Sequence, residues 1–292
     1  MPVNHLQILD QTIFDIVSEN EQKIGDHLNG EVIFFYGEIR PALILVFRNF
    51  IEKICDRPER SRRLIVCINT PGGSAEVVEK LVDIIRHHFD EVYFVVPDVA
   101  MSAGTIFCMS GDKIYMDYSS SLGPIDPQVA DAEDRFLVPA LGYLDKVAEF
   151  IKKSNDGTIS AAEFALLEKQ DLAMLRLYEQ ARDLSVSLLK EWLVRYKFKD
   201  WIVHRTNNAG AEVTLAEKVA RAEEIAQQLS DNGRWHAHGR MIGMKRLQEL
   251  RLEIDDLETD KSLRDAVRRY SDTLCDYLAR QRISSFLFNR YV

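Results

Sequence analysis

The sequence lacks any apolar run that approaches the about 18 residues needed for a membrane-spanning helix. Its first residues, MPVNHLQILDQTIFDIV, contain no basic stretch followed by an unbroken apolar stretch, because Asp10 and Asp15 interrupt the pattern. From these absences we expect a soluble, cytoplasmic protein without membrane insertion.

Cysteine is scarce, with four residues in 292 and no C-x-x-C spacing. Cys67 and Cys108 lie inside apolar runs, where cysteine behaves as a small hydrophobic residue. This usage is typical of reduced core thiols in a reducing compartment and gives no disulfide framework. His236 and His238 form an H-x-H pair, but no further cluster of ligands completes a metal site, so we expect no metal.

Positive charge is not in excess. The chain has 37 Lys and Arg against 46 Asp and Glu, a formal net charge of −9. This balance argues against nucleic acid or an anionic membrane as the main partner.

The sequence also has neither G-x-G-x-x-G nor G-x-x-x-x-G-K-[ST], and we find no lysine motif for a pyridoxal cofactor. We therefore expect no cofactor.

What the sequence does contain is an alternation of strands and helices in its first 130 residues. Continuous apolar runs at 32–36, 64–68 and 92–96 are typical of strands buried on both faces of a parallel sheet, and 113–116 predicts a further short strand. Helical patterns cover 6–29, 42–54, 75–89 and 102–109. This order predicts βαβ units and an α/β fold with a mainly parallel sheet.

Beyond residue 130 the pattern becomes mostly helical. Periodicity predicts helices over 137–153, 160–198 and 214–230, a loop over 232–239, and charged helices within 244–282. The last region is interpreted as the solvated face of a helical pair that is available for subunit contact. We divide the chain into a catalytic core, 1–198, and a mainly helical C-terminal extension, 199–292.

Two loops follow predicted strands at the edge where parallel sheets bind ligands. The first contains Gly72 and Gly73, whose conformational freedom lets a ligand approach main-chain N–H groups. The second places Ser102 at the first turn of a helix, among small residues and unsatisfied amides. Both features stabilise negative charge on an attacked carbonyl oxygen. Taken singly, the glycines also suit a plain turn or a phosphate cradle, and Ser102 also suits a helix cap.

At these residues the sequence resembles the Clp protease and signal peptide peptidase A group, and more closely the serine dehydrogenase proteinase family. The matching segments are 70–74 (TPGGS), 101–105 (MSAGT), 121–128 (SLGPIDPQ), 191–193 (EWL) and 235–240 (WHAHGR).

The resemblance implies a ClpP/crotonase-like spiral of ββα units that usually forms a homo-oligomer. It also implies a serine endopeptidase with Ser102 as nucleophile and an oxyanion hole built from the N–H of Gly72 or Gly73 and that of Ala103. The substrate would be an extended peptide or protein segment held by main-chain hydrogen bonds.

The general base departs from the Clp pattern, because segment 121–128 offers Asp126 but no histidine. A serine–lysine dyad, as in signal peptide peptidases, needs a lysine whose pKa is lowered by burial. Lys146 is the first candidate, with Lys152 and Lys153 in reserve. Asp126 either orients the base or caps the Gly-Pro turn, and His238 folding back as the base stays open.

Two other function classes fit parts of the pattern. A crotonase-like acyl-CoA hydratase or thioesterase uses the same two-amide hole without a serine nucleophile, and a hydratase needs paired glutamates in the pocket. The missing histidine also leaves room for a non-catalytic oligomeric scaffold that binds extended peptides.

Overall fold

The computed structural model describes residues 5–126, 128–130, 137–204 and 209–292. Its main sheet has six strands in the order β10-β5-β3-β2-β1-β11. Adjacent strands are parallel except for the β1–β11 pair, which is antiparallel. The strands are β1 (Glu31–Gly37), β2 (Arg63–Asn69), β3 (Glu91–Val96), β5 (Lys113–Met116), β10 (Asp255–Asp256) and β11 (Ser285–Phe288). The predicted α/β fold with a mainly parallel sheet is confirmed.

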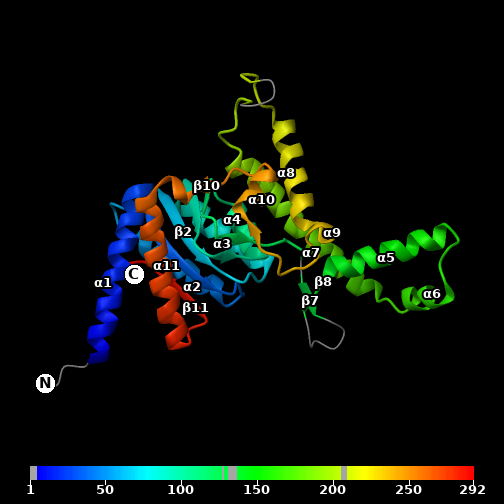
Figure 1. Cartoon of the computed structure of the whole chain (residues 1–292), viewed down its shortest axis with the longest axis horizontal. Helices are drawn as coiled ribbons and strands as arrows, with labels where there is room; N and C mark the ends of the chain where they lie inside the picture. The colour runs from blue at the N-terminus through cyan, green and yellow to red at the C-terminus, as the bar shows by residue number, and fades with distance from the viewer. Residues whose placement is uncertain (1–4, 127, 131–136, 205–208) are drawn as a thin grey trace.

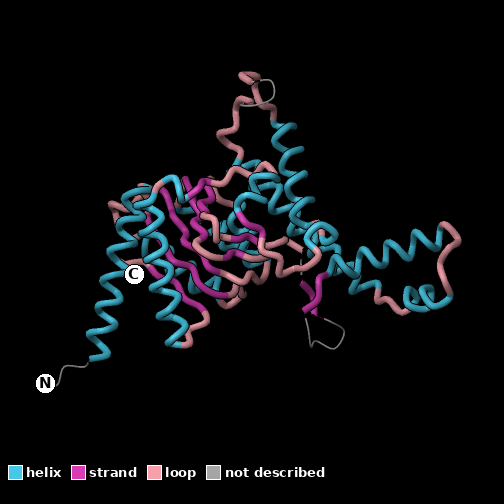
Figure 2. The backbone as a smooth tube through the Cα atoms, viewed as in Figure 1, coloured by secondary structure: helices cyan, strands magenta, loops and turns pink. Residues whose placement is uncertain are grey.

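Helices cover both faces of this sheet, as Figures 1 and 2 show. Alternate residues of a strand point to opposite faces, so Ile33 and Phe35 of β1 join one core whereas Val32 and Phe34 join the other. The first core packs against α2 (Leu43–Cys55), α3 (Ala75–His88), α4 (Ala103–Met109), α7 (Leu172–Trp192) and α8 (Leu215–Ser230). The second packs against α1 (His5–Leu28) and α11 (Lys261–Gln281). The strands are therefore apolar on both sides because neither side faces water.

The C-terminal region is more than a solvated helical pair. One face of α11 buries Leu263, Val267 and Tyr270 against the sheet, although the helix is rich in charge. Strands β10 and β11 each extend an edge of the main sheet. The remaining elements of this region are α9 (Asn232–Trp235), β9 (Ile242–Gly243), α10 (Met244–Glu249) and a 3₁₀ turn at Leu257–Thr259. The helical extension predicted for 199–292 thus also contributes strands to the core sheet.

The helical stretch predicted over 160–198 is divided in the structure into α6 (Ala161–Glu168), α7 and a π-helical turn at Leu193–Lys197. The break occurs because the Asp171 carboxylate caps α7, accepting the N–H of Ala173 at 2.8 Å.

The prediction for 137–153 was wrong at its start, since β8 (Leu137–Pro139) pairs with β7 (Gln128–Ala130) before α5 (Ala140–Asn155) begins. Helices α5 and α6 project from the body as an arm (Figure 1).

In the part of the chain that the structure describes, no helix is both long enough and apolar enough to cross a membrane. All four cysteines are free, and Cys67 and Cys108 are buried.

Candidate active site

Ser102 follows the end of β3 and the short β4 (Val99–Ala100), and it stands immediately before α4. Its backbone has φ 50° and ψ −117°, a conformation that L-residues rarely adopt. Although Ser102 occupies the N-cap position of α4, its side chain makes no capping hydrogen bond. Ser74 by contrast does cap its helix, accepting the N–H of Val77 at 3.1 Å. The Ser102 hydroxyl is therefore not used to complete the helix.

The glycine loop lies directly against Ser102. Gly72 has φ +105°, and a Cβ atom there would lie 2.7 Å from the Met101 carbonyl oxygen and 2.9 Å from the Ser102 Cβ. Only glycine allows this close approach of two backbones. The two loops singled out in the sequence are thus brought together.

Three N–H groups near Ser102 differ in their availability. That of Gly72 donates to the Thr70 hydroxyl at 3.0 Å, so it is already satisfied. Those of Gly73 and Ala103 have no acceptor among the described residues. Gly73 is held in place because the adjacent Ser74 N–H donates to Ile39 O at 3.0 Å.

A buried hydroxyl joins the Ser102 helix to the next segment of the site. Thr105 Oγ1 lies 2.8 Å from the carbonyl oxygen of Ala100, and it accepts the N–H of Gly123 at 2.9 Å. Thr105 is completely buried, so these hydrogen bonds are shielded from water. They fix the chain that leads from Gly123 to Asp126.

Asp126 is hydrogen-bonded to His238: the Asp126 Oδ1 lies 2.9 Å from His238 Nδ1. Asp126 is 1% exposed, and its Oδ2 has no hydrogen-bond partner among the described residues. Strand β9 pairs with β6 (Ser121–Leu122), and these strands lie four residues away from His238 and Asp126 respectively. This pairing places a histidine beside a carboxylate 112 residues earlier in the chain.

Ser102 and His238 line the same cavity, of about 580 Å³. The remaining lining comes from Glu38, Ile39, Arg40, Pro41, Pro71, Gly72, Gly73, Ser74, Ala75, Glu76, Ala103, Ile106, Ile125, Ala181 and Ser185. Apolar and small side chains form much of this wall, and the charged residues Glu38, Arg40 and Glu76 are exposed to solvent.

The candidate lysines do not line this cavity. Lys146 has an exposed side chain whose Nζ pairs with Glu149 at 2.8 Å. Lys152 is exposed on the same helix. Lys153 Nζ lies 2.6 Å from Glu163, and this hydrogen bond raises the lysine pKa. A raised pKa favours the ammonium form, which cannot accept a proton.

The histidine pair divides between two environments. His236 is exposed, with φ 63°, whereas His238 is half-buried against Asp126. The lysines were predicted ahead of His238, because spacing along the chain cannot reveal a contact made through a strand pairing. The H-x-H motif beside Trp235 was the available signal.

Two curated proteins of one organism are similar to this chain over about two thirds of its length. The chain is 27% identical to the uncharacterized protein MJ0137 of Methanocaldococcus jannaschii over 67% of this chain and 54% of that one. It is 24% identical to the uncharacterized protein MJ1495 of the same organism, over 64% of this chain and 50% of that one. The chain thus spans about half the length of these curated relatives.

A solved structure, ClpP1 from Listeria monocytogenes, aligns with 85% of this chain and 95% of its own, at 12% identity and a TM-score of 0.41. The family model for the ClpP-like SDH-type serine proteinase matches residues 51–201. That match covers more than half of the chain and includes both Ser102 and the glycine loop. The chain belongs to the ClpP-like SDH-type serine proteinase family.

Proposed function

We propose that the protein is a serine endopeptidase in which Ser102 attacks the substrate carbonyl and forms an acyl-enzyme. The observation that carries this proposal is the single cavity lined by Ser102, by the glycine loop and by His238 with its buried carboxylate partner. The Ser102 hydroxyl makes no capping bond, so it is available as a nucleophile.

The oxyanion hole is assigned to the N–H groups of Gly73 and Ala103. Both lack acceptors among the described residues, whereas the Gly72 N–H is already engaged by Thr70. The role of Gly72 is then to permit the close approach of the loops rather than to donate. Two preorganised donors aimed at the developing oxyanion lower the barrier to acyl transfer.

The general base is assigned to His238 rather than to Lys146. Asp126 accepts a hydrogen bond at His238 Nδ1, which leaves Nε2 to take the Ser102 proton and stabilises the imidazolium that results. The proton then passes to the leaving amine. Water, deprotonated by the same histidine, next attacks the acyl-enzyme and releases the acyl group from Ser102. A serine–lysine dyad with Lys146 would require the arm to bring an exposed, ion-paired amine to the cavity.

The substrate is proposed to be an extended peptide or unfolded protein segment, because an open cavity beside backbone donors suits main-chain recognition. A solved structure of the 1510-N membrane-bound stomatin-specific protease in complex with a substrate peptide is 23% identical to this chain, with 41% of this chain and 57% of that one covered and a TM-score of 0.33. We further propose that the enzyme is a cytoplasmic homo-oligomer.

A labelled fluorophosphonate tests the nucleophile and the base together. Wild-type protein should be modified stoichiometrically at Ser102, as read by intact-protein mass spectrometry, and Ser102→Ala should not react. His238→Ala and Asp126→Asn should slow labelling, the former by at least about 100-fold. Lys146→Met is the matched control and should label at the wild-type rate.

Each alternative gives a different pattern. Slow labelling in Lys146→Met with normal labelling in His238→Ala would establish the lysine as base. No labelling of folded wild-type protein would favour the crotonase-like hydratase or the peptide-binding scaffold. The hydratase has some support, since Glu38 and Glu76 line the same cavity. However, both glutamates are exposed and already bonded, to Arg40 and to the Ser74 hydroxyl respectively.

A further inference from the structure

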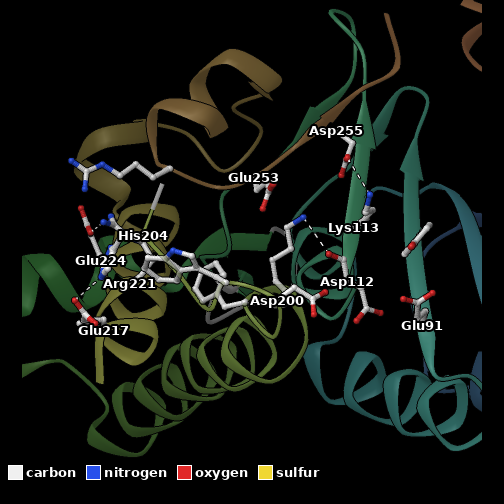
Figure 3. A pocket seen from close by; sticks show the side chains of 16 residues that line it. Glu91, Asp112, Lys113, Asp200, His204, Glu217, Arg221, Glu224, Glu253 and Asp255 are labelled. Carbon is white, nitrogen blue, oxygen red and sulfur yellow. Dashed lines mark hydrogen bonds and ion pairs between the residues drawn. The ribbon is translucent and has the colours of Figure 1, made fainter. Parts of the chain in front are cut away.

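A second and larger cavity, of about 900 Å³, lies away from Ser102. Glu91 and Lys113, at the beginnings of β3 and β5, line it, whereas Ser102 follows the carboxyl end of β3. The two cavities therefore lie at opposite ends of the parallel strands. Figure 3 shows that Asp112, which precedes β5, lies in the same part of this cavity as Glu253 and Asp255, which come from the segment that leads into β10.

Lys197 lines this cavity with a buried ammonium group. The residue is 8% exposed and ends the π-helical turn. Its Nζ has one polar contact among the described residues, with the carbonyl oxygen of Asp112 at 3.5 Å. An ammonium has three donors and is costly to bury without an anion.

Two of the neighbouring carboxylates, Asp112 and Asp255, pair with other cations. Asp112 binds Arg86 at 2.9 Å and Lys199 at 2.6 Å. Asp255 lies 3.7 Å from Lys113 Nζ. Burial lowers the pKa of Lys197 to about 8, although the negative charges of Asp255, Glu253 and Asp112 act in the opposite direction. Among the described residues the Lys197 ammonium forms no ion pair, so a bound anion would compensate its burial further.

The rest of the lining restricts which anion fits. Seven carboxylates and four Lys or Arg side chains surround the cavity, a formal excess of three negative charges. A polyanion such as a nucleotide is repelled by this excess. Asp200, which is exposed and has no ion-pair partner in the described chain, offers a site for a positive group. Trp201 and Phe198 supply an aromatic wall, with ring centroids 5.7 Å apart.

We propose that this cavity is a second binding site, which takes a small zwitterion, namely a free amino acid or dipeptide with an apolar side chain. The ligand carboxylate binds the Lys197 ammonium, the ligand ammonium faces Asp200, and the apolar side chain packs on Trp201. This assignment is independent of the proposed peptidase chemistry.

Isothermal titration calorimetry with matched probes tests the site. L-Phenylalanine should bind saturably, whereas L-phenylalaninamide, without the carboxylate, and 3-phenylpropionate, without the ammonium, should bind at least about 10-fold more weakly, because each loses one charge-assisted hydrogen bond. Binding of L-phenylalanine should also weaken as the pH rises above 8, since the lysine then loses its proton.

Two variants probe the two ends of the ligand. Lys197→Met keeps the apolar stem and should weaken L-phenylalanine binding at least about 10-fold while leaving the amide unaffected. Asp200→Asn, at an exposed position, should remove the advantage of L-phenylalanine over 3-phenylpropionate. Lys190→Met is the control, because this lysine pairs with Glu223 and does not line the cavity.

Absence of saturable binding by both L-phenylalanine and alanyl-phenylalanine at concentrations up to about 10 mM would overturn the proposal. So would equal binding of the acid and the amide, or unchanged affinity in folded Lys197→Met. If Lys197→Met does not fold, the Asp200→Asn result decides, and an unchanged preference for the zwitterion there overturns the proposal.

Discussion

Ser102 combines an unusual backbone with an unused hydroxyl. A non-glycine residue with φ 50° and ψ −117° stores about 1–3 kcal/mol of strain. The surroundings maintain the conformation, because Thr105 forms hydrogen bonds with Ala100 and Gly123, and the Gly72 backbone lies directly against Met101 and Ser102. Backbone strain of this kind is expected where a residue at the start of a helix directs its side chain into a cavity instead of capping the helix.

The strain can be measured by substitution. Ser102→Gly should be more stable than Ser102→Ala by about 1 kcal/mol, because glycine adopts positive φ without a Cβ penalty. Neither variant should react with a fluorophosphonate. The measurement is urea-induced unfolding followed by circular dichroism. Equal stability of the two variants would mean that the backbone relaxes without cost.

Gly72→Ala should greatly reduce fluorophosphonate labelling, because its Cβ would press on the Met101 carbonyl and on Ser102. Gly157→Ala is the matched control, since Gly157 also has positive φ but nothing lies within 4 Å of its Cβ position. The control should cost stability, about 1 kcal/mol, and leave the labelling rate unchanged. Normal labelling of Gly72→Ala would show that the contact between the loops does not position Ser102.

At the scale of elements, the strands were predictable because each is an apolar run that two helical layers cover. The TPGGS and MSAGT loops were found for a similar local reason: their unusual residues are adjacent in sequence. The boundary at Asp171 was missed because a side-chain cap interrupts an otherwise continuous helical period. The His238–Asp126 pair lies 112 residues apart and depends on the β6–β9 pairing, which no local pattern encodes.

Glu21 connects three elements that are distant in sequence. Its buried carboxylate accepts the N–H of Arg290 at 3.0 Å and the hydroxyl of Tyr270 at 3.2 Å. It thus joins α1 to α11 and to the segment after β11. Burial outweighs these bonds and raises the pKa of Glu21 to about 7, from 4.5.

This raised pKa has a consequence for stability. Between pH 4.5 and 7 the unfolded state releases the Glu21 proton while the folded state keeps it. The contribution of Glu21 to stability is therefore complete below pH 4.5 and is lost as the pH rises through about 7. Glu21→Gln keeps one acceptor oxygen and removes the titration.

Urea unfolding at pH 4.5 and at pH 7.5 measures this effect. The free energy of unfolding of wild type relative to Glu21→Gln should fall across this range by up to about 3 kcal/mol. Glu19→Gln, on the exposed face of the same helix, is the control and should not show this fall. A constant difference between wild type and Glu21→Gln would mean that the carboxylate ionises normally in the fold.

At the scale of the whole molecule, one helical element reaches both cavities. Ala181 and Ser185 of α7 line the cavity of Ser102, and Lys197, at the end of the π-helical turn that continues α7, lines the second. The two cavities lie at opposite ends of the strands, so a ligand in one does not block the other. Any influence between them would pass along α7, whose buried Leu188, Leu189 and Trp192 pack in the first core.

The arm formed by α5 and α6 is difficult to explain in an isolated chain. Helix α6 has no buried residue, and its Phe164 and Leu166 are 51% and 55% exposed. Apolar side chains gathered on a projecting element mark a surface for association, and a second copy of the chain is the partner proposed above.

Wild type should therefore sediment as a species larger than the 33.6 kDa chain in analytical ultracentrifugation. Phe164→Glu should shift the protein toward the single chain, because a charge would be buried at the contact. Val46→Glu, at a similarly exposed apolar position on α2, should leave the assembly intact. A wild-type protein that sediments as a single chain, or a Phe164→Glu variant that assembles like wild type, would exclude this arm as the subunit contact.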